Sequence, residues 1–196
     1  MFLPTEPSEK FVSKFIARQR GVPFSYAEVG ATSDTPPHGY SLDHNRIQLG
    51  TGEQVYERSV EALREWRQFD LGWVKIVPSG VAIEVGATVA IKARAFGSWS
   101  LNAARIVYVI NEDRPVKRFG FAYGTLPDHV ERGEERFTVE WHRQDDYVWY
   151  DILAFSQPRH PLVRMSFPLA RMLQRRFVRD SKRRMVEASQ LQNPER

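Results

Sequence analysis

The chain contains no cysteine among its 196 residues. This absence excludes a disulfide framework, a thiol nucleophile, and zinc or iron–sulfur sites built on Cys ligands. No apolar run reaches the roughly 18 residues of a membrane span, so none is predicted. The first ten residues hold two prolines and two glutamates instead of a basic stretch followed by an apolar one. We therefore expect no signal peptide and a cytoplasmic location.

Several motifs that announce a known chemistry are also missing. The sequence has no G-x-S-x-G elbow, no P-loop and no G-x-G-x-x-G fingerprint, so no nucleotide-binding or hydrolase motif is present. It has no H-x-H or H-E-x-x-H spacing of the kind that binds metal ions. We accordingly predict neither a cofactor nor a metal site.

The charge of the chain is unevenly distributed. The formal net charge is +4, but residues 159–196 carry ten Lys or Arg and three Asp or Glu, which leaves −3 for the first 158 residues. The basic stretch Arg175–Arg184 fits the solvent face of a helix, or a contact surface for nucleic acid or anionic lipid. A nucleic-acid partner is not expected, because the chain lacks a recognised nucleic-acid motif. We expect one domain over residues 1–188 and a disordered polar tail over residues 189–196.

Three segments have the periodicity of amphipathic helices. They cover residues 8–20, about 52–69 and 166 to about 187. Each begins with a residue suited to an N-cap, and the second begins with a T-x-x-Q sequence of the capping-box type. These N-caps are Ser8, Thr51 and Ser166.

Between residues 73 and 155 the apolar period changes to two, which is typical of β-strands. The connections between these segments are short and turn-like, so neighbouring strands should be antiparallel. A further strand is expected over residues 40–49, which makes about seven. The six others cover residues 73–77, 87–96, 103–111, 117–124, 134–142 and 147–155.

This order of elements predicts an α+β domain in which a curved antiparallel sheet of about seven strands grips a long C-terminal helix. Leu169, Leu173 and Phe177 recur on one face of that helix, and we expect this face to cover the sheet. The order is similar to the helix-grip fold of the START and pollen-allergen-like lipid-binding superfamily. In that fold the sheet wraps the last helix, and a cavity remains between them.

Short runs spread along the chain carry a more specific resemblance. They are Tyr26–Thr32, Leu71–Val74, Gly97–Asn102, Arg105–Tyr108, Arg118–Pro127, Gly133–Glu135, Val148–Ser156 and Leu173–Phe177. In this order they resemble one uncharacterised domain-of-unknown-function family, over roughly residues 11–185. The resemblance implies a single domain of helix-grip type. It implies no established activity, so no catalytic residue is carried over from it.

The loop between residues 123 and 135 is the densest polar stretch of the chain. A histidine flanked by carboxylates suits general acid–base catalysis, because its pKa is near neutrality and carboxylates tune it. The candidate catalytic residues are His129, Glu131, Glu134 and Tyr123, and Glu135 belongs to the same run. The same residues also fit a solvated hairpin loop with turns at Pro127-Asp128 and Arg132-Gly133.

Two charged residues in the strands are candidate anchors for a ligand. Arg105 can hold an anionic head group if it faces the cavity, or it can lie on the wet outer face of the sheet. Asp151 shares its alternation phase with Trp149 and Phe155, so on a buried face it must be paired or protonated. Arg105 is its expected partner. Asp151 is then either a cavity acid or a paired core group that sets the strand register.

Aromatic side chains are plentiful in the sheet region, where they supply core packing and the lining of an apolar pocket. Together with the two charged anchors they form the predicted ligand-binding set. That set is Arg105, Asp151, Trp99, Tyr108, Phe121, Tyr123, Trp149 and Phe177.

These patterns leave three functional hypotheses. The leading one is non-catalytic binding of a small hydrophobic or amphipathic molecule between sheet and helix. The second is a lyase, cyclase or hydrolase that uses His129 and the nearby carboxylates. The third is an interaction protein that acts through its basic C-terminal helix.

Overall fold

A computed structural model describes residues 1–158 and 167–190, and of residues 167 and 168 only the backbone. The helices are α1 (Glu9–Gln19), α2 (Glu53–Arg64) and α4 (Phe167–Gln190), with short 3₁₀ turns η1 (Ala31–Ser33) and η2 (Arg67–Phe69). The strands are β1 (Phe2–Leu3), β2 (Ser41–Thr51), β3 (Val74–Val77), β4 (Thr88–Ala95), β5 (Ser98–Glu112), β6 (Val116–Thr125), β7 (Glu131–His142) and β8 (Tyr147–Pro158).

The strands form one antiparallel sheet in the order β2-β8-β7-β6-β5-β4-β3, with β1 paired to β5. Strands β3 to β8 follow one another as a meander, as their short connections predicted. β2 is the exception, because it pairs with β8 at the far end of the chain and so forms the other edge of the sheet. The predicted antiparallel sheet is confirmed.

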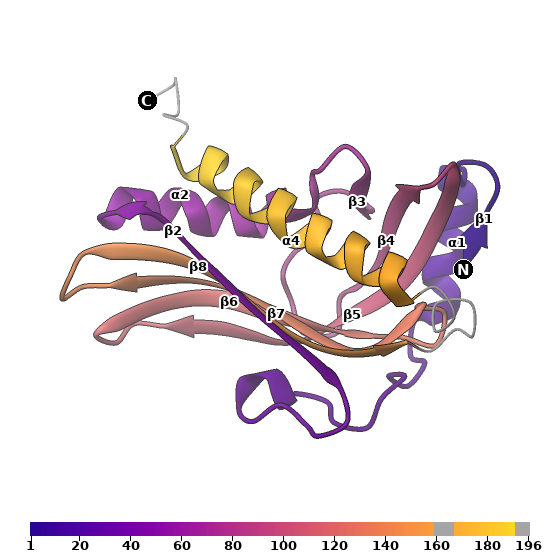
Figure 1. Ribbon diagram of the computed structural model, residues 1–196, viewed down its shortest axis with the longest axis horizontal. Helices are drawn as coiled ribbons and strands as arrows, with labels where there is room; N and C mark the ends of the chain where they lie inside the picture. Colours follow the sequence, from indigo (N-terminus) through magenta and orange to yellow (C-terminus); the bar gives the residue numbers. More distant parts are fainter. Residues whose placement is uncertain (159–166, 191–196) are drawn as a thin grey trace.

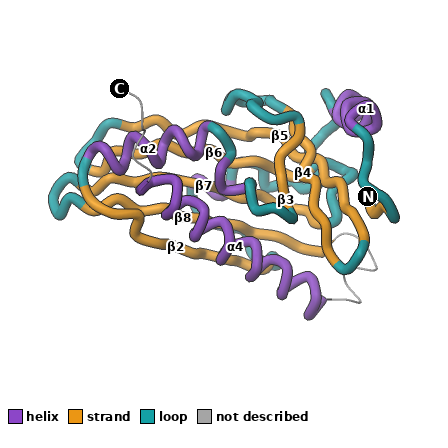
Figure 2. Tube along the Cα trace, turned by 90° about the horizontal axis from the view of Figure 1, so that it is seen from above, coloured by secondary structure: helices purple, strands orange, loops and turns teal. Residues whose placement is uncertain are grey.

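Helix α4 lies across one face of this sheet, and α2 lies beside its C-terminal half (Figures 1 and 2). The core between helices and sheet is rich in aromatic rings from α2, η2 and the central strands. Phe137 has no exposed surface and is close to the rings of Phe69, Phe121 and Tyr150. The chain therefore has the predicted α+β architecture of a sheet that grips its C-terminal helix.

The second predicted helix is shorter than its sequence pattern suggests. α2 ends at Arg64, and Trp66 takes a left-handed backbone conformation with φ of 59°, after which η2 begins. The predicted capping box is wrong, because Thr51 is still paired with β8 as the last residue of β2. The N-cap is Gly52, at φ of 87°, and no side chain caps the helix.

The C-terminal helix is longer than predicted. It continues to Gln190, and Ser189 is fully buried and donates a hydrogen bond to the Val186 carbonyl at 2.8 Å. Residues 189 and 190 therefore belong to α4 rather than to a polar tail. The remainder of that predicted tail, and the predicted N-cap Ser166, lie outside the described residues.

The face of the sheet opposite α4 is also covered. Tyr26 and Tyr40, from the segment between α1 and β2, both pack edge-on against Phe155 of β8 at ring-centroid distances of 5.7 and 5.0 Å. Gly124 leaves room for this cover, since a Cβ there would lie 2.2 Å from the Tyr26 hydroxyl. Strand β8 thus has a buried residue on each of its two faces.

Candidate functional site

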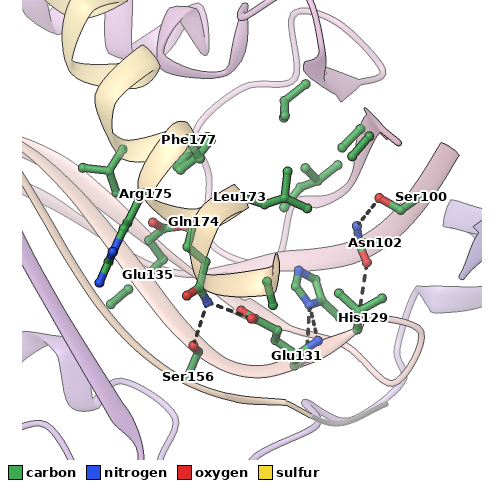
Figure 3. A pocket seen from close by; sticks show the side chains of 18 of the residues that line it. Ser100, Asn102, His129, Glu131, Glu135, Ser156, Leu173, Gln174, Arg175 and Phe177 are labelled. Atoms are coloured by element: carbon green, nitrogen blue, oxygen red, sulfur yellow. Dashed lines mark hydrogen bonds between the residues drawn. The ribbon is translucent and has the colours of Figure 1, made fainter. Parts of the chain in front are cut away.

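A pocket of about 750 Å³ lies between the sheet and the first half of α4. This volume is within the range of small-molecule sites, which is about 300–1,000 Å³. Its walls come from β2, from the hairpin of β4 and β5, from β6 to β8, and from α4. Figure 3 shows that Leu173, Gln174 and Phe177 of α4 approach this space from the helix side.

One end of the pocket is apolar and continuous with the core. Phe69 of η2 is 2% exposed and still lines the pocket, with its ring centroid 5.0 Å from that of Phe177. Trp73, Ile91 and Leu173 line the same space. A ligand that buries apolar surface here would gain about 25 cal/mol of binding free energy for each Å² removed from water.

The other end of the pocket carries half-buried carboxyl groups from β7. Glu131 and Glu135 are four residues apart, so strand alternation turns both toward α4. The Gln174 amide donates a hydrogen bond to Glu131 Oε1 at 2.7 Å (Figure 3). The Tyr123 hydroxyl donates to Glu135 Oε2 at 2.5 Å. Two acids thus meet the pocket at its floor.

Burial controls the protonation of these groups, since it disfavours their charged forms. It raises the pKa of Glu135 to about 7, an effect that the hydrogen bond from Tyr123 opposes and the nearby Glu131 carboxylate reinforces. It also raises the pKa of Glu131, against the hydrogen bonds from Gln174 and Ser156. Glu135 is consequently poised to change its charge near neutral pH.

His129 lines the same end of the pocket but cannot act as an ordinary acid–base group. Burial lowers the pKa of His129 to about 3. Its Nδ1 accepts a hydrogen bond from the Glu131 backbone N–H at 3.0 Å, which fits a neutral ring protonated at Nε2. The acid–base hypothesis rested on a histidine pKa near neutrality, and the buried ring does not have one.

We expect His129 to make the stability of the protein sensitive to acid. Its pKa is about 3 in the folded chain and near 6.5 when unfolded, so only the unfolded state binds this proton between those values. The stabilisation present above pH 6.5 should be lost as the pH falls, by up to about 1.4 kcal/mol per unit. Urea unfolding between pH 4 and 7 measures this slope, and His129→Asn should reduce it. An NMR titration of the His129 ring with a midpoint between pH 5 and 7 would contradict the prediction.

The predicted site residues divide between the two faces of the sheet. Trp99, Tyr123 and Phe177 line the pocket, as do His129, Glu131 and part of Glu134. The Glu134 carboxylate, however, accepts hydrogen bonds from Tyr26, Gly30 and Thr32, which belong to the segment on the opposite face. Its role as a catalytic candidate is therefore not supported, because its oxygens are engaged away from the pocket.

Arg105 and Tyr108 have opposite strand phase, yet both lie on the face away from the pocket, because β5 is irregular between them. The register of β5 against β6 shifts between Ile106 and Tyr108, so simple alternation fails there. Arg105 donates to the backbone carbonyls of Val22 and Gln19 at 2.9 and 2.6 Å. The Tyr108 hydroxyl lies 2.7 Å from that of Thr32. Both side chains hold the N-terminal segment in place instead of a ligand.

Asp151 and Trp149 lie on the same far face. Asp151 is buried and paired, as its structural interpretation predicted, but its partners are Arg136 at 3.1 Å and His44 at 2.6 Å, not Arg105. Trp149 is stacked under the guanidinium of Arg46 at 4.6 Å. Phe121 does face the helices, but it is fully buried among Trp66 and Phe137. None of these three lines the pocket.

Sequence reasoning named Glu135 in the polar run but did not choose it as a site residue, and it missed Gln174 and Ser156. Glu135 had a detectable signal, because it shares its strand phase with Glu131 and Phe137, which is a buried position. Gln174 follows Leu173 in the predicted C-terminal helix, but arginines come directly after it, so nothing marked it as a residue of the pocket. Ser156 lies just beyond the strand predicted over residues 147–155, and nothing in the local sequence marked it as a site residue.

Among residues 1–158 and 167–190, no three His, Asp or Glu side chains gather in a way that would hold a metal ion. The described helices include none with the length and apolar character needed to cross a bilayer. The pocket thus combines apolar walls with the acids Glu131 and Glu135, the imidazole of His129 and basic side chains of α4 such as Arg175 and Lys182.

Comparison with known proteins identifies the family of the chain. Residues 25–184 match the family model described as a domain of unknown function, DUF1990. The chain belongs to this family. A UPF0548 protein of Dictyostelium discoideum is 38% identical to the DUF1990 chain over 207 residues, covering 96% of this chain and 95% of the relative. The predicted membership of an uncharacterised family is confirmed.

Solved structures resemble the DUF1990 chain in fold at low sequence identity. The hypothetical protein jhp0584 of Helicobacter pylori is similar with a TM-score of 0.51 and 12% identity, covering 86% of this chain and 96% of that one. Human STARD10 is similar with a TM-score of 0.47 and 10% identity, covering 94% and 80%. The predicted helix-grip type agrees with the sheet and α4 described above.

Proposed function

We propose that this DUF1990 protein binds a small hydrophobic or amphipathic molecule in the pocket between its sheet and α4. The observation that supports this most directly is the pocket itself, whose 750 Å³ are lined by elements from both halves of the chain. Its apolar end would hold the body of the ligand, and the acids of β7 would meet its polar group. Trp99, Tyr123 and Phe177 are the predicted contacts that take part.

The basic helix offers less support for the competing hypothesis of an interaction surface. Three of its arginines, Arg176, Arg179 and Arg183, lie 3.6, 3.0 and 4.0 Å from the buried carboxylate of Asp180. Asp180 in turn accepts a hydrogen bond from the Trp73 indole at 3.1 Å. These ion pairs are internal to α4, so part of its positive charge is balanced within the helix, and the Trp73 contact ties Asp180 to the rest of the fold.

Blocking the pocket should abolish binding. Replacement of Leu173 with tryptophan places a larger side chain in the pocket, and we expect the affinity for an apolar probe such as 1-dodecanol to fall by at least about tenfold, because the probe and the indole compete for one space. Met172→Trp is the matched control, since Met172 is the adjacent helix residue, is 49% exposed and does not line the pocket. Isothermal titration with each variant gives the two affinities.

Two results would contradict the proposal. One is a wild-type protein that binds no apolar probe and carries no retained ligand in native mass spectrometry. The other is equal binding by Leu173→Trp and Met172→Trp, which would place the binding site elsewhere. Unfolding curves of the two variants show whether each is folded under the conditions of the titration.

A further inference from the structure

The acid at the pocket floor has unused capacity to accept hydrogen bonds. Among the described residues Glu135 has one polar partner, the Tyr123 hydroxyl, on Oε2. Glu135 lines the pocket, and its other oxygen has no hydrogen-bond donor among the described residues. A carboxylate has about four lone-pair positions, so most of the positions on Glu135 await a donor.

No cation among the described residues is in direct contact with Glu135 or Glu131, although the more distant Arg171 lowers the pKa of Glu131. Neither acid forms an ion pair within 4.0 Å. Arg171 is the nearest candidate on α4, but it donates to both oxygens of Asp43 at 2.5 and 2.8 Å. Buried carboxylates are normally paired. Among the described residues no cation pairs directly with Glu135, so its charged form has room for a partner from outside.

The His129 ring at the same end of the pocket also has one nitrogen without a partner among the described residues. The Nδ1 of His129 is used by the Glu131 backbone, and no described residue contacts Nε2. The neutral ring therefore presents Nε2–H as one donor, while Glu135 presents acceptors. A head group that meets Glu135 has to donate, whereas the Nε2–H of His129 needs a separate acceptor.

We propose that the polar group recognised in this pocket is a protonated amine on an apolar body, held by the carboxylates of Glu135 and Glu131. This inference rests on the proposed function, because it names the class of ligand for that same pocket. Charge-assisted hydrogen bonds of an ammonium to a desolvated carboxylate are about twice as strong as neutral ones. The apolar end beside Phe69 and Leu173 would take the rest of the molecule.

Binding of such a ligand should depend on pH. The groups that face Glu135 are Tyr123 of β6, Tyr150 of β8, Glu131 of β7 and Asp43 of β2, with Arg171 held by Asp43. Arg175, Arg179 and Lys182 of α4 lie at the lining farther along the helix. Because Glu135 ionises near pH 7, the ammonium finds its partner increasingly charged as the pH rises.

The test compares three probes of equal chain length: dodecylamine, 1-dodecanol and dodecanoate. Titration calorimetry below their micelle concentrations should show dodecylamine as the tightest at pH 8, with an affinity about tenfold higher at pH 8 than at pH 6. The affinity for 1-dodecanol should change less than twofold. Dodecanoate should bind more weakly than the alcohol, because it meets two acids.

Two variants and a control locate the effect. Glu135→Gln should lower the dodecylamine affinity at pH 8 by about 10- to 100-fold and remove most of its pH dependence. Tyr123→Phe should move the midpoint of that dependence to higher pH, since Glu135 loses its only donor. Glu61→Gln makes the same chemical change on α2, where the side chain is 64% exposed, and should leave all three probes unaffected.

The outcomes distinguish a failure of this inference from a failure of the proposed function. If 1-dodecanol binds but dodecylamine binds no tighter at pH 8, the amine inference fails and the pocket proposal stands. Tighter binding of dodecanoate would likewise overturn it, because the basic residues of α4 would then select the ligand. If no probe binds, both fail. The pH profile of the wild-type protein alone decides the matter should Glu135→Gln not fold.

Discussion

Replacing Glu134 with alanine should lower the free energy of unfolding by about 3–5 kcal/mol. The side chain is 2% exposed and collects hydrogen bonds from the Tyr26 hydroxyl at 2.6 Å, the Gly30 N–H at 2.7 Å and the Thr32 N–H at 2.9 Å. The Thr32 hydroxyl donates a fourth. Alanine would leave all of these donors without their acceptor in a buried layer, which costs far more than the bonds contribute when they are made.

The measurement is urea unfolding at pH 7, followed by the fluorescence of the tryptophans. Glu57→Ala is the control, since Glu57 is exposed on α2, and it should change the free energy of unfolding by less than about 0.5 kcal/mol. A loss below 1 kcal/mol in Glu134→Ala would mean that the segment around η1 is held mainly by its aromatic contacts. Because Glu134 was a catalytic candidate, this result also decides whether it is structural.

The contrast between Glu134 and Glu135 shows what adjacent positions in a strand can do. Glu134 faces the N-terminal segment and accepts four hydrogen bonds, whereas Glu135 faces the pocket and accepts one. Alternation along β7 therefore places two chemically identical side chains in opposite electrostatic situations. One carboxylate is saturated with donors, and the other retains capacity for a partner from outside.

Much of the architecture follows from local patterns. The change of apolar period near residue 73 locates the meander, and the short turns make it antiparallel without reference to distant contacts. The face of α4 that carries Leu173 and Phe177 does cover the sheet, as its periodicity indicated. These features are predictable because each depends on residues that are neighbours in the chain.

The misplaced site residues depend on distant segments instead. The shift in β5 after Ile106 depends on pairing with β6, and it brings Tyr108 to the same face as Arg105, away from the pocket. The phase shared by Asp151 and Phe155 correctly indicated a buried face, but there are two buried faces, because the segment carrying Tyr26 and Tyr40 covers the second. No periodicity within β8 distinguishes a face covered by α4 from one covered by that segment.

Phe69→Ala should cost about 3–5 kcal/mol of folding free energy, the usual range for deleting a buried phenylalanine ring. The ring lies within 5.0–6.1 Å of the rings of Trp66, Tyr123, Phe137 and Phe177, so its loss removes packing from η2, β6, β7 and α4 together. Phe96→Ala, at a turn where the side chain is 62% exposed, should cost less than about 1 kcal/mol and serves as the control.

Phe69 also separates the core from the pocket, and this gives its replacement a second consequence. The void left by the ring opens into the pocket that Phe69 lines, so an apolar probe can occupy both. Saturating 1-dodecanol should therefore raise the melting temperature of Phe69→Ala by more than it raises that of the wild-type protein, because a ligand that binds only the folded state stabilises it. Equal shifts in the two proteins would mean that the core closes over the missing ring, and that the wall between core and pocket is not formed by Phe69 alone.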